Sequence, residues 1–240
     1  MAYTTIKKPS DYFNTKLYTG NGGTNAITGV GFQPDFTWLK RRNSTGSHLW
    51  QDVIRGANYN IRSDKTDAEA DSGSIHLNSF DTDGFTVAGT GTHSNDNGST
   101  YASWNWLANG TGSANTDGSI SSTVSASTTS GFSVVKLDTG TSGNISFGHG
   151  LGVAPKVVII KTTSGGGNWI VGHDSIGWGK YLNLNNGNAE ASDSTVWQNT
   201  APTNSVVTTN STFIYNTGST IVAYCFAEKQ GYSKFGSYTG

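Results

Sequence analysis

The chain has 240 residues, enough for one large domain or two ordinary ones, and only 13% of them are charged, against roughly 25% in a typical globular domain. A formal net charge of −1 argues against strong attraction to nucleic acid or to an anionic membrane. The single cysteine, Cys225, excludes an internal disulfide and a metal cluster built on cysteine. We expect no cofactor and no bound metal.

No stretch of the sequence resembles a secretion signal or a membrane span. Residues 1–9 lack the apolar core of a signal peptide, and no run reaches the roughly 18 consecutive apolar residues that a transmembrane helix needs. We therefore expect a protein made in the cytoplasm, with no membrane insertion. The basic trio Lys40-Arg41-Arg42 is interpreted as a solvated strand end rather than a nucleic-acid site.

The composition of the chain favours many short strands joined by tight turns. The chain contains 32 glycines, 4 prolines, 7 Trp, 10 Tyr and 10 Phe, a mix that favours strands and turns over helices. Asp83-Gly84 and Asn97-Gly98 are hairpin signals. In residues 101–106, strict alternation puts Ala102, Trp104 and Trp106 on one face, which we expect to point into the core.

The same order of patterns recurs in the second half, at an offset of 120 to 122 residues (136 − 16 and 174 − 52). Residues 13–20 align with 133–140, which sets Lys16 against Lys136. The other aligned blocks are 31–40 with 152–161, 49–54 with 171–176, 67–70 with 188–191, and 98–106 with 218–226. This alignment sets Gln51-Asp52 against His173-Asp174 and predicts a duplication.

The turn-rich residues 109–118 mark the predicted boundary between the copies. The first β-sandwich repeat is expected over 1–110 and the second over 111–240, with a strand opening near 119–124. Val222, Tyr224 and Phe226 are predicted to repeat the inward face, and Lys156–Lys161, apolar on both faces, is predicted to be a central strand. The fold class is therefore all-β: two tandem antiparallel β-sandwich units, jelly-roll or concanavalin-like, with little helix. Residues 237–240 echo 17–20, which suggests the start of a further repeat in a longer parent.

These landmarks, taken together, resemble a tandem repeat domain of largely unassigned function in structural proteins of marine bacteriophages. The motifs that carry the resemblance span nearly the whole chain: residues 8–15, 18–22, 31–40, 55–57, 148–156, 168–171, 223–228 and 231–240. The resemblance implies a virion component such as a tail fibre, spike or other surface appendage. It carries over no catalytic or binding residue.

Enzyme signatures are missing from the sequence. A sandwich glycosidase needs paired carboxylates, but the chain has only Glu69, Glu190 and Glu228, and we expect Glu69 to lie in a solvated acidic loop with Asp67 and Asp71. Nucleophile-elbow, zinc-protease and phosphate-loop motifs do not occur. Residues 81–84 resemble the start of a calcium loop, but a tight turn is the favoured interpretation. We predict that the protein is not an enzyme.

Carbohydrate binding is the remaining chemistry to consider, because sugars stack on exposed aromatic rings. Trp178 lies between glycines in a predicted loop and is the first candidate, followed by Trp50 and, more weakly, Trp197; the alternative is that each ring covers core. Arg55 is a candidate for a ligand contact or a strand cap. His173 is a candidate for a ligand contact or a strand-end hydrogen bond.

The sequence thus predicts a phage structural protein, located in the virion, that binds host surface glycan or other virion proteins through loops at the sandwich ends. Linked weak sites in two repeats would gain avidity, and a trimer is expected by analogy with fibres and spikes. The first alternative is a capsid decoration or fibre-spacer protein with no host ligand. The second is a polysaccharide-degrading enzyme, which would require clustered carboxylates in a groove.

Overall fold

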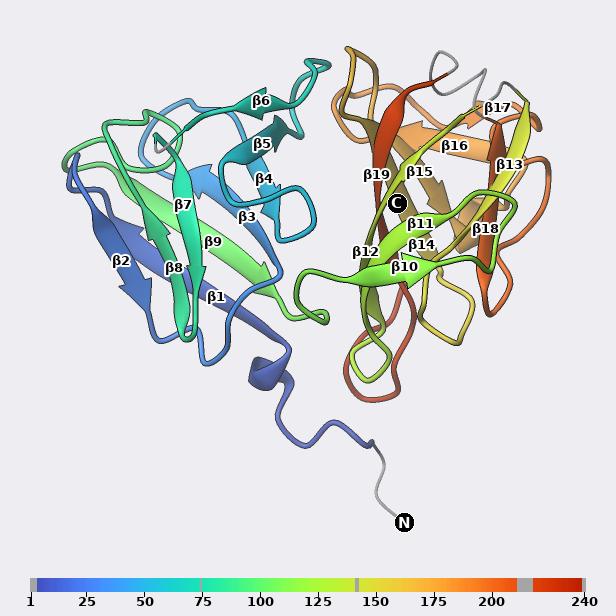
Figure 1. The fold of residues 1–240 in the computed structure, drawn as a ribbon, viewed down its shortest axis with the longest axis horizontal. Helices are drawn as coiled ribbons and strands as arrows, with labels where there is room; N and C mark the ends of the chain where they lie inside the picture. The colour runs from blue at the N-terminus through green and yellow to red at the C-terminus, as the bar shows by residue number, and fades with distance from the viewer. Residues whose placement is uncertain (1–3, 74, 141–142, 211–217, 239–240) are drawn as a thin grey trace. The chain divides into compact units, whose positions relative to one another are not determined.

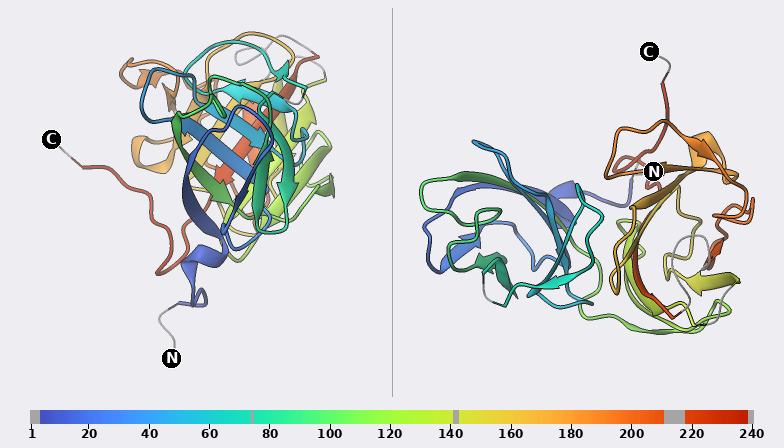
Figure 2. Two further views of the ribbon diagram at one scale, coloured as in Figure 1. Left: turned by 90° about the vertical axis from the view of Figure 1, so that its left-hand side faces the viewer. Right: turned by 90° about the horizontal axis from the view of Figure 1, so that it is seen from above.

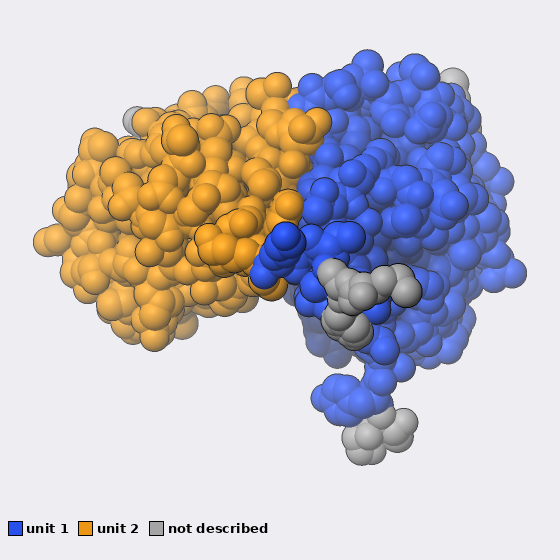
Figure 3. Space-filling model, turned by 90° about the horizontal axis from the view of Figure 1, so that it is seen from below, with its two compact units in different colours: residues 1–7, 112–240 blue, residues 8–111 orange. Residues whose placement is uncertain are grey.

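The structure, a computed structural model, describes residues 4–73, 75–140, 143–210 and 218–238 (Figure 1). The fold is all-β, as predicted: in these residues the only helices are two three-residue 3-10 turns, η1 (Pro9–Asp11) and η2 (Asp174–Ile176). The chain divides into an N-terminal unit, residues 8–111, and a C-terminal unit, residues 112–240 together with 1–7 (units 2 and 1 in Figure 3). Each unit is described below by itself.

The N-terminal unit contains two antiparallel sheets with a core between them. The six-stranded sheet runs, in spatial order, β1 (Phe13–Thr19), β9 (Thr100–Trp106), β3 (Phe36–Arg41), β4 (Leu49–Asp52), β5 (Tyr59–Arg62) and β6 (Ala70–Asp71). The three-stranded sheet runs β2 (Asn25–Thr28), β8 (Gly84–Val87) and β7 (Leu77–Asp81). Both sheets contribute to one buried cluster: Ile27, Leu39, Leu49, Leu77, Phe85 and Val87.

The C-terminal unit is built in the same way. Its eight-stranded sheet runs β10 (Ser113–Asn115), β11 (Ser122–Ser127), β12 (Phe132–Asp138), β19 (Thr220–Phe226), β14 (Val157–Thr162), β15 (Ile170–His173), β16 (Lys180–Asn183) and β17 (Ala191–Ser192). The two-stranded sheet pairs β13 (Asn144–Gly148) with β18 (Val206–Asn210). Its buried cluster draws on both sheets, including Leu137, Phe147, Ile160, Val207 and Ala223. Each unit is therefore sandwich-like, with a large and a small sheet on either side of its core (Figure 2).

The strand orders of the two large sheets correspond. The order β1-β9-β3-β4-β5-β6 has the same sequence of connections as β12-β19-β14-β15-β16-β17, and the pair β2-β8 has the same place as β13-β18. Among the residues that the structure describes, two differences remain: β10 and β11 extend the C-terminal sheet beyond β12, and β7 extends the small sheet of the N-terminal unit. Lys156–Lys161 was predicted to be a central strand, and β14 lies between β19 and β15 as expected.

In neither unit does the last strand turn its predicted inward face toward the core cluster, although Val222 and Tyr224 on that face are fully buried. In β19 the residues in the core cluster are Ile221, Ala223 and Cys225, so Val222, Tyr224 and Phe226 face the opposite side of the sheet. In β9 the ring of Tyr101 stacks on Tyr18, which packs on the core, so Ala102, Trp104 and Trp106 also point away from it. The face of β9 toward the core carries the buried polar residues Ser103 and Asn105, so the alternation of apolar residues pointed to the opposite face.

The predicted alignment of the two halves is one residue out in two places. Lys16 pairs with Ser103 of β9, whereas Val135 pairs with Ala223 at the equivalent place in β19. Lys16 therefore corresponds to Val135, not to Lys136. By the same reasoning Asp52, opposite Phe36, corresponds to His173, opposite Val157, so Asp174 does not correspond to Asp52. Matching identical letters placed the lysines together, but the ladder of pairings decides the register.

Candidate functional site

A cavity of about 500 Å³ opens in the N-terminal unit where three loops meet. Lys40 comes from the end of β3, and Thr45, Gly46 and Ser47 come from the loop between β3 and β4. The remaining lining residues are Asp64 and Lys65, which follow β5, and Thr92 and His93, which precede β9. Residues from distant parts of the sequence thus meet at one end of the large sheet. We call this cavity the three-loop pocket.

Hydrogen bonds between backbone groups and side chains connect the loops that form the three-loop pocket. The Ser47 N–H donates to Nδ1 of His93 at 3.0 Å, which joins the first loop to the third. The His48 N–H donates to Oδ1 of Asp64 at 2.9 Å, which joins the first loop to the second. The ammonium group of Lys40 donates to the carbonyl of Gly46 at 2.9 Å. These bonds leave the hydroxyl groups of Thr45, Ser47 and Thr92 as additional polar groups in the lining.

Burial keeps His93 in the pocket lining, and the nearby His76, neutral near pH 7. Burial, followed by the positive charge of Arg62, lowers the pKa of His93. Burial also lowers the pKa of His76 to about 4, with smaller contributions from His93 and Arg62. The rings of His76 and His93 lie 6.0 Å apart, and His76 contacts the hydroxyl of Ser94 at 2.9 Å. Because His93 accepts at Nδ1, its neutral ring carries the proton on Nε2.

One carboxylate, Asp64, lines the pocket. Burial alone would raise the pKa of Asp64, but backbone hydrogen bonds, that from His48 among them, and the nearby His48 and Lys65 lower it overall. Asp64 is therefore a hydrogen-bond acceptor at neutral pH, surrounded by hydroxyl and ammonium donors. This lining can bind a hydroxylated ligand through hydrogen bonds. Within the described residues, no group of three or more His, Cys, Asp or Glu side chains is placed to hold a metal ion.

The tryptophans predicted to contact a ligand are buried. Trp178 is only 7% exposed, its ring stands edge-on to Trp197 at 5.4 Å, and its Nε1–H donates to Asp174 at 3.4 Å. Trp50 is 2% exposed and packs against Phe36. The expectation that Trp178 is exposed is wrong, because its ring packs against Trp197 in the core cluster of the C-terminal unit.

Arg55 is buried in a network of ion pairs. Its Nε lies 2.6 Å from Asp52 and its Nη1 lies 2.8 Å from Glu69, and it also donates to the carbonyl of Trp50 at 3.0 Å. Glu69 therefore does not lie in a purely solvated loop, and Asp67 likewise forms an ion pair with Arg62. Arg55 connects the turn after β4 to the loop before β6, which is a structural role.

His173 and Asp174 do not form a catalytic pair. Nδ1 of His173 accepts from the Ser175 N–H at 3.1 Å, and the carboxylate of Asp174 accepts from Lys156 at 2.8 Å, which lowers the pKa of Asp174. The strand-end hydrogen bond considered for His173 is present. Residues 81–84 form the tight turn between β7 and β8, in which Asp83 accepts from the N–H groups of Gly29 and Gly31.

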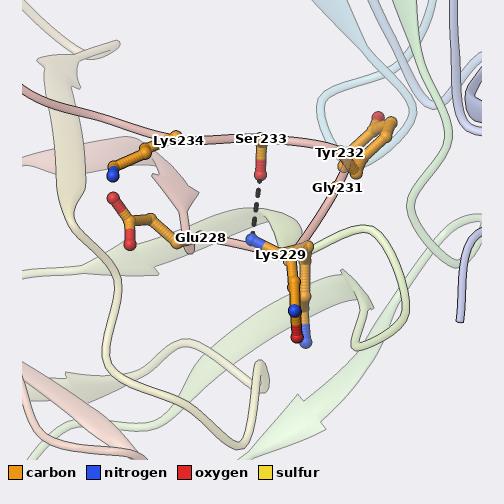
Figure 4. Close-up of a pocket in the computed structure, with 7 residues that line it drawn as sticks. Glu228, Lys229, Gly231, Tyr232, Ser233 and Lys234 are labelled. Atoms are coloured by element: carbon orange, nitrogen blue, oxygen red, sulfur yellow. Dashed lines mark hydrogen bonds between the residues drawn. The ribbon is translucent and has the colours of Figure 1, made fainter. Parts of the chain in front are cut away.

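A second cavity, of about 450 Å³, lies in the C-terminal unit and is lined by residues 228–234 (Figure 4). It is formed by one continuous segment, closed by reciprocal backbone hydrogen bonds between Lys229 and Ser233. Glu228 and Lys234 point toward each other in Figure 4, while Tyr232 points away. Glu228 also accepts from the Phe235 N–H at 3.1 Å. Its polar groups are largely used in holding the segment's own conformation.

Sequence reasoning missed the three-loop pocket. It treated the histidines as scattered and Lys40 as part of a solvated strand end. Lys40, Asp64 and His93 come together only because β3, β5 and the approach to β9 end on the same side of the sheet. No spacing rule connects these positions, and turn-like polar residues around each of them gave no distinguishing signal.

Residues 8–240 match a family described as a domain of unknown function, DUF7483. The chain belongs to this family. The matched range includes every strand that the structure describes in both units of this DUF7483 chain. No curated protein and no solved structure matches it. In the described part of the chain, no helix has the length and apolar character needed to cross a membrane.

Proposed function

We propose that this chain is a phage virion structural protein, part of a tail fibre, spike or other surface appendage, that binds host surface glycan or another virion protein without cleaving it. The resemblance of its motifs to phage structural proteins supports the virion role. The three-loop pocket supports the binding role, and it is the single observation on which the proposal depends. Its donors and acceptors suit the hydroxyl groups of a sugar.

The distribution of carboxylates argues for binding rather than glycoside cleavage. Glycosidases place two carboxyl groups on either side of the scissile bond, but Asp64 is the only one in the pocket lining. Glu69 is held by Arg55, and Glu190 is held by Lys180 at the equivalent place in the other unit. The acidic groups therefore serve as acceptors and ion-pair partners in this proposal, with no cofactor and no nucleic acid involved.

We further propose that the two units descend from one duplicated sandwich of the jelly-roll or concanavalin-like kind. The corresponding strand orders support this, and so does a shared detail of the loops. The His48 N–H donates to Asp64 at 2.9 Å, and the Trp169 N–H donates to Asn185 at 2.8 Å at the equivalent place. Two copies of a binding module in one chain gain avidity when both engage.

A glycan array with the purified chain tests the proposal. We expect saturable binding to a hydroxyl-rich bacterial surface glycan, weakened about tenfold or more by Lys65→Asn, which gives the pocket the residue found at the equivalent position, Asn186. The matched control is Lys234→Asn, in the second cavity of Figure 4, which should bind like the unsubstituted chain. Circular dichroism checks that both variants are folded.

Two results would count against the proposal. Binding lost in the Lys234 variant and kept in the Lys65 variant would move the site to the C-terminal unit. No binding to any glycan by the unsubstituted chain would leave a capsid decoration or spacer role as the better explanation.

A further inference from the structure

The strand β1 in the N-terminal unit has one neighbour, whereas its counterpart β12 has two. β12 pairs with β19 on one side and with β11 on the other. In the part of the chain that the structure describes, β1 pairs with β9 alone and ends the sheet. An edge strand of seven residues presents a row of backbone N–H and C=O groups to any extended chain that reaches it.

The residues of β1 that face outward follow from the ladder with β9. Gly20 donates its N–H to Ser99, and the carbonyl of Tyr12 accepts from Leu107, so the even-numbered residues bond toward β9. The odd-numbered residues, Phe13, Thr15, Leu17 and Thr19, therefore direct their backbone groups outward. The Thr15 N–H already bonds to the side chain of Asn14, and the Thr19 carbonyl accepts from Asn25.

Leu17 lies in the middle of this outward edge. Its side chain is 63% exposed, the highest value for a large aliphatic residue in the described chain. The equivalent residue in β12 is Lys136, which pairs with Thr123 of β11. The N-terminal unit thus presents an apolar side chain and unpaired backbone groups at the place where the C-terminal unit has a covering strand.

On the core-facing side of β1, the side chain of Lys16 lies where the side chain of Val124 of β11 lies in the C-terminal unit. A Cβ on Gly29, in the loop after β2, would lie 2.8 Å from Nζ of Lys16. A Cβ on Gly150, in the loop after β13, would lie 2.9 Å from a methyl group of Val124 in β11. The lysine amine therefore lies over the loop after β2 much as Val124 lies over the loop after β13.

We infer that the outer edge of β1 binds an extended strand of a neighbouring chain, which adds to the sheet in the position that β11 takes beside β12. β11 indicates the kind of strand that fits: small and hydroxylated side chains in alternation, Ser122-Thr123-Val124-Ser125-Ala126-Ser127. The residue at the place of Val124 would lie directly opposite Lys16, because Val124 pairs with Val135. An acidic residue at that place forms a favourable cross-strand pair.

The first test measures binding of a labelled peptide with the sequence of residues 120–128 carrying Val124→Glu to the full-length chain, by fluorescence anisotropy. We expect saturable binding, about threefold or more tighter than that of the matching Val124→Lys peptide, with the difference reduced by salt. Equal binding of the two peptides, or no binding, would overturn the inference.

Backbone-methylated peptides give a control that leaves the protein unchanged. Thr123 and Ser125 pair with the outward residues Lys136 and Val134 of β12, so their N–H groups are the donors in the ladder. In the Val124→Glu peptide, N-methylation of Thr123 and Ser125 should abolish binding. N-methylation at position 124 and at Ala126 should leave binding intact. The opposite order would contradict strand addition in the proposed register.

A variant of the chain tests the same edge from the protein side. Leu17→Pro removes an outward N–H while leaving the ladder to β9, and proline is tolerated on such edges; it should weaken peptide binding about tenfold. Leu17→Ser, which keeps the N–H, should bind within about threefold of the unsubstituted chain. Amide exchange gives an independent readout: the Leu17 N–H should exchange rapidly and slow when peptide is added. Protection without peptide would show a covered edge and refute the inference.

Discussion

The two units place different side chains on one backbone framework. In the N-terminal unit, the position before β4 is His48, and the residues after β5 are Asp64 and Lys65. In the C-terminal unit, the equivalent residues are Trp169, Asn185 and Asn186, and Trp169 is fully buried. The backbone bond from the first position to the side chain of the second is kept in both. The bond needs an oxygen acceptor, which Asp and Asn both supply, so the framework persists while the charge of the loop changes.

The cores of the units also differ in how they are completed. The small sheet of the N-terminal unit has a third strand, β7, whose Leu77 joins the core. In the C-terminal unit, Val196 and Trp197 lie in turn segments and join the core cluster. The ring of Trp197 thus fills core volume in the C-terminal unit, whereas a residue of an added strand, Leu77 of β7, does so in the N-terminal unit. The core of the same sandwich can be completed by a strand or by a side chain from a turn.

The largest expected effect comes from removing that ring. Trp197 is fully buried and packs against Trp178, and a Cβ on Gly172 would lie 2.9 Å from it. Trp197→Ala should lower the free energy of unfolding by about 3–5 kcal/mol because it leaves a cavity between the sheets. Chemical denaturation followed by tryptophan fluorescence and circular dichroism measures the change. Trp197→Phe, which fills part of the space, should cost distinctly less; equal losses for the two variants would show that the ring does not support the core.

A smaller effect is expected from pH, and it should arise in the N-terminal unit. Because the pKa of His76 is lowered to about 4 from its ordinary value of 6.5, the unfolded chain binds a proton between these values that the folded chain does not. Stability is therefore full above pH 6.5 and falls as the pH drops toward 4, by at most about 3 kcal/mol from this group. Thermal unfolding across this range measures the loss.

The matched variant for the pH experiment is His76→Gln. It should flatten the dependence of stability on pH between 6.5 and 4, although its stability at neutral pH falls if the contact with Ser94 is lost. An unchanged pH dependence in this variant would assign the loss to other groups, such as His48 or His149, whose pKa values burial also lowers.

The smallest effect on stability is expected from exchanging the loop residues between units. Asp64→Asn with Lys65→Asn gives the N-terminal unit the residues of the C-terminal one and keeps an acceptor for the His48 N–H. The free energy of unfolding should change by less than about 1 kcal/mol, while ligand binding should be lost. Denaturation and glycan binding measured on the same sample separate the two effects. A loss of several kcal/mol would show that the charged pair is structural.

Composition and alternation were sufficient to predict an all-β fold with antiparallel pairing, because Gly-rich turns and β-branched or aromatic runs are local properties. They did not predict which face of β9 and β19 is the core, since the core face of β9 carries the polar residues Ser103 and Asn105. The register of Lys16 was misjudged for a related reason: identity of one letter outweighed the pairing of the whole strand. Trp178 was expected to be exposed because its glycine neighbours indicate a loop, but a loop can also turn a ring inward onto Trp197.

The site was harder to predict than the fold. Lys40, Asp64 and His93 meet through the order of the strands, and that order is a long-range property that no local pattern contains. For Arg55 the sequence left open a ligand contact or a strand cap, and only the structure shows its contacts with Asp52 and Glu69.

The most direct test of the central claim, that the three-loop pocket is the binding site, is a two-dimensional NMR titration of the ¹⁵N-labelled chain with the glycan that binds best on the array. We expect the backbone amide signals of Gly46, Ser47, Lys65 and Thr92 to shift together and to saturate with one dissociation constant. Shifts confined to residues 228–234, or to the loops of the C-terminal unit at Asn185 and Asn186, would contradict it.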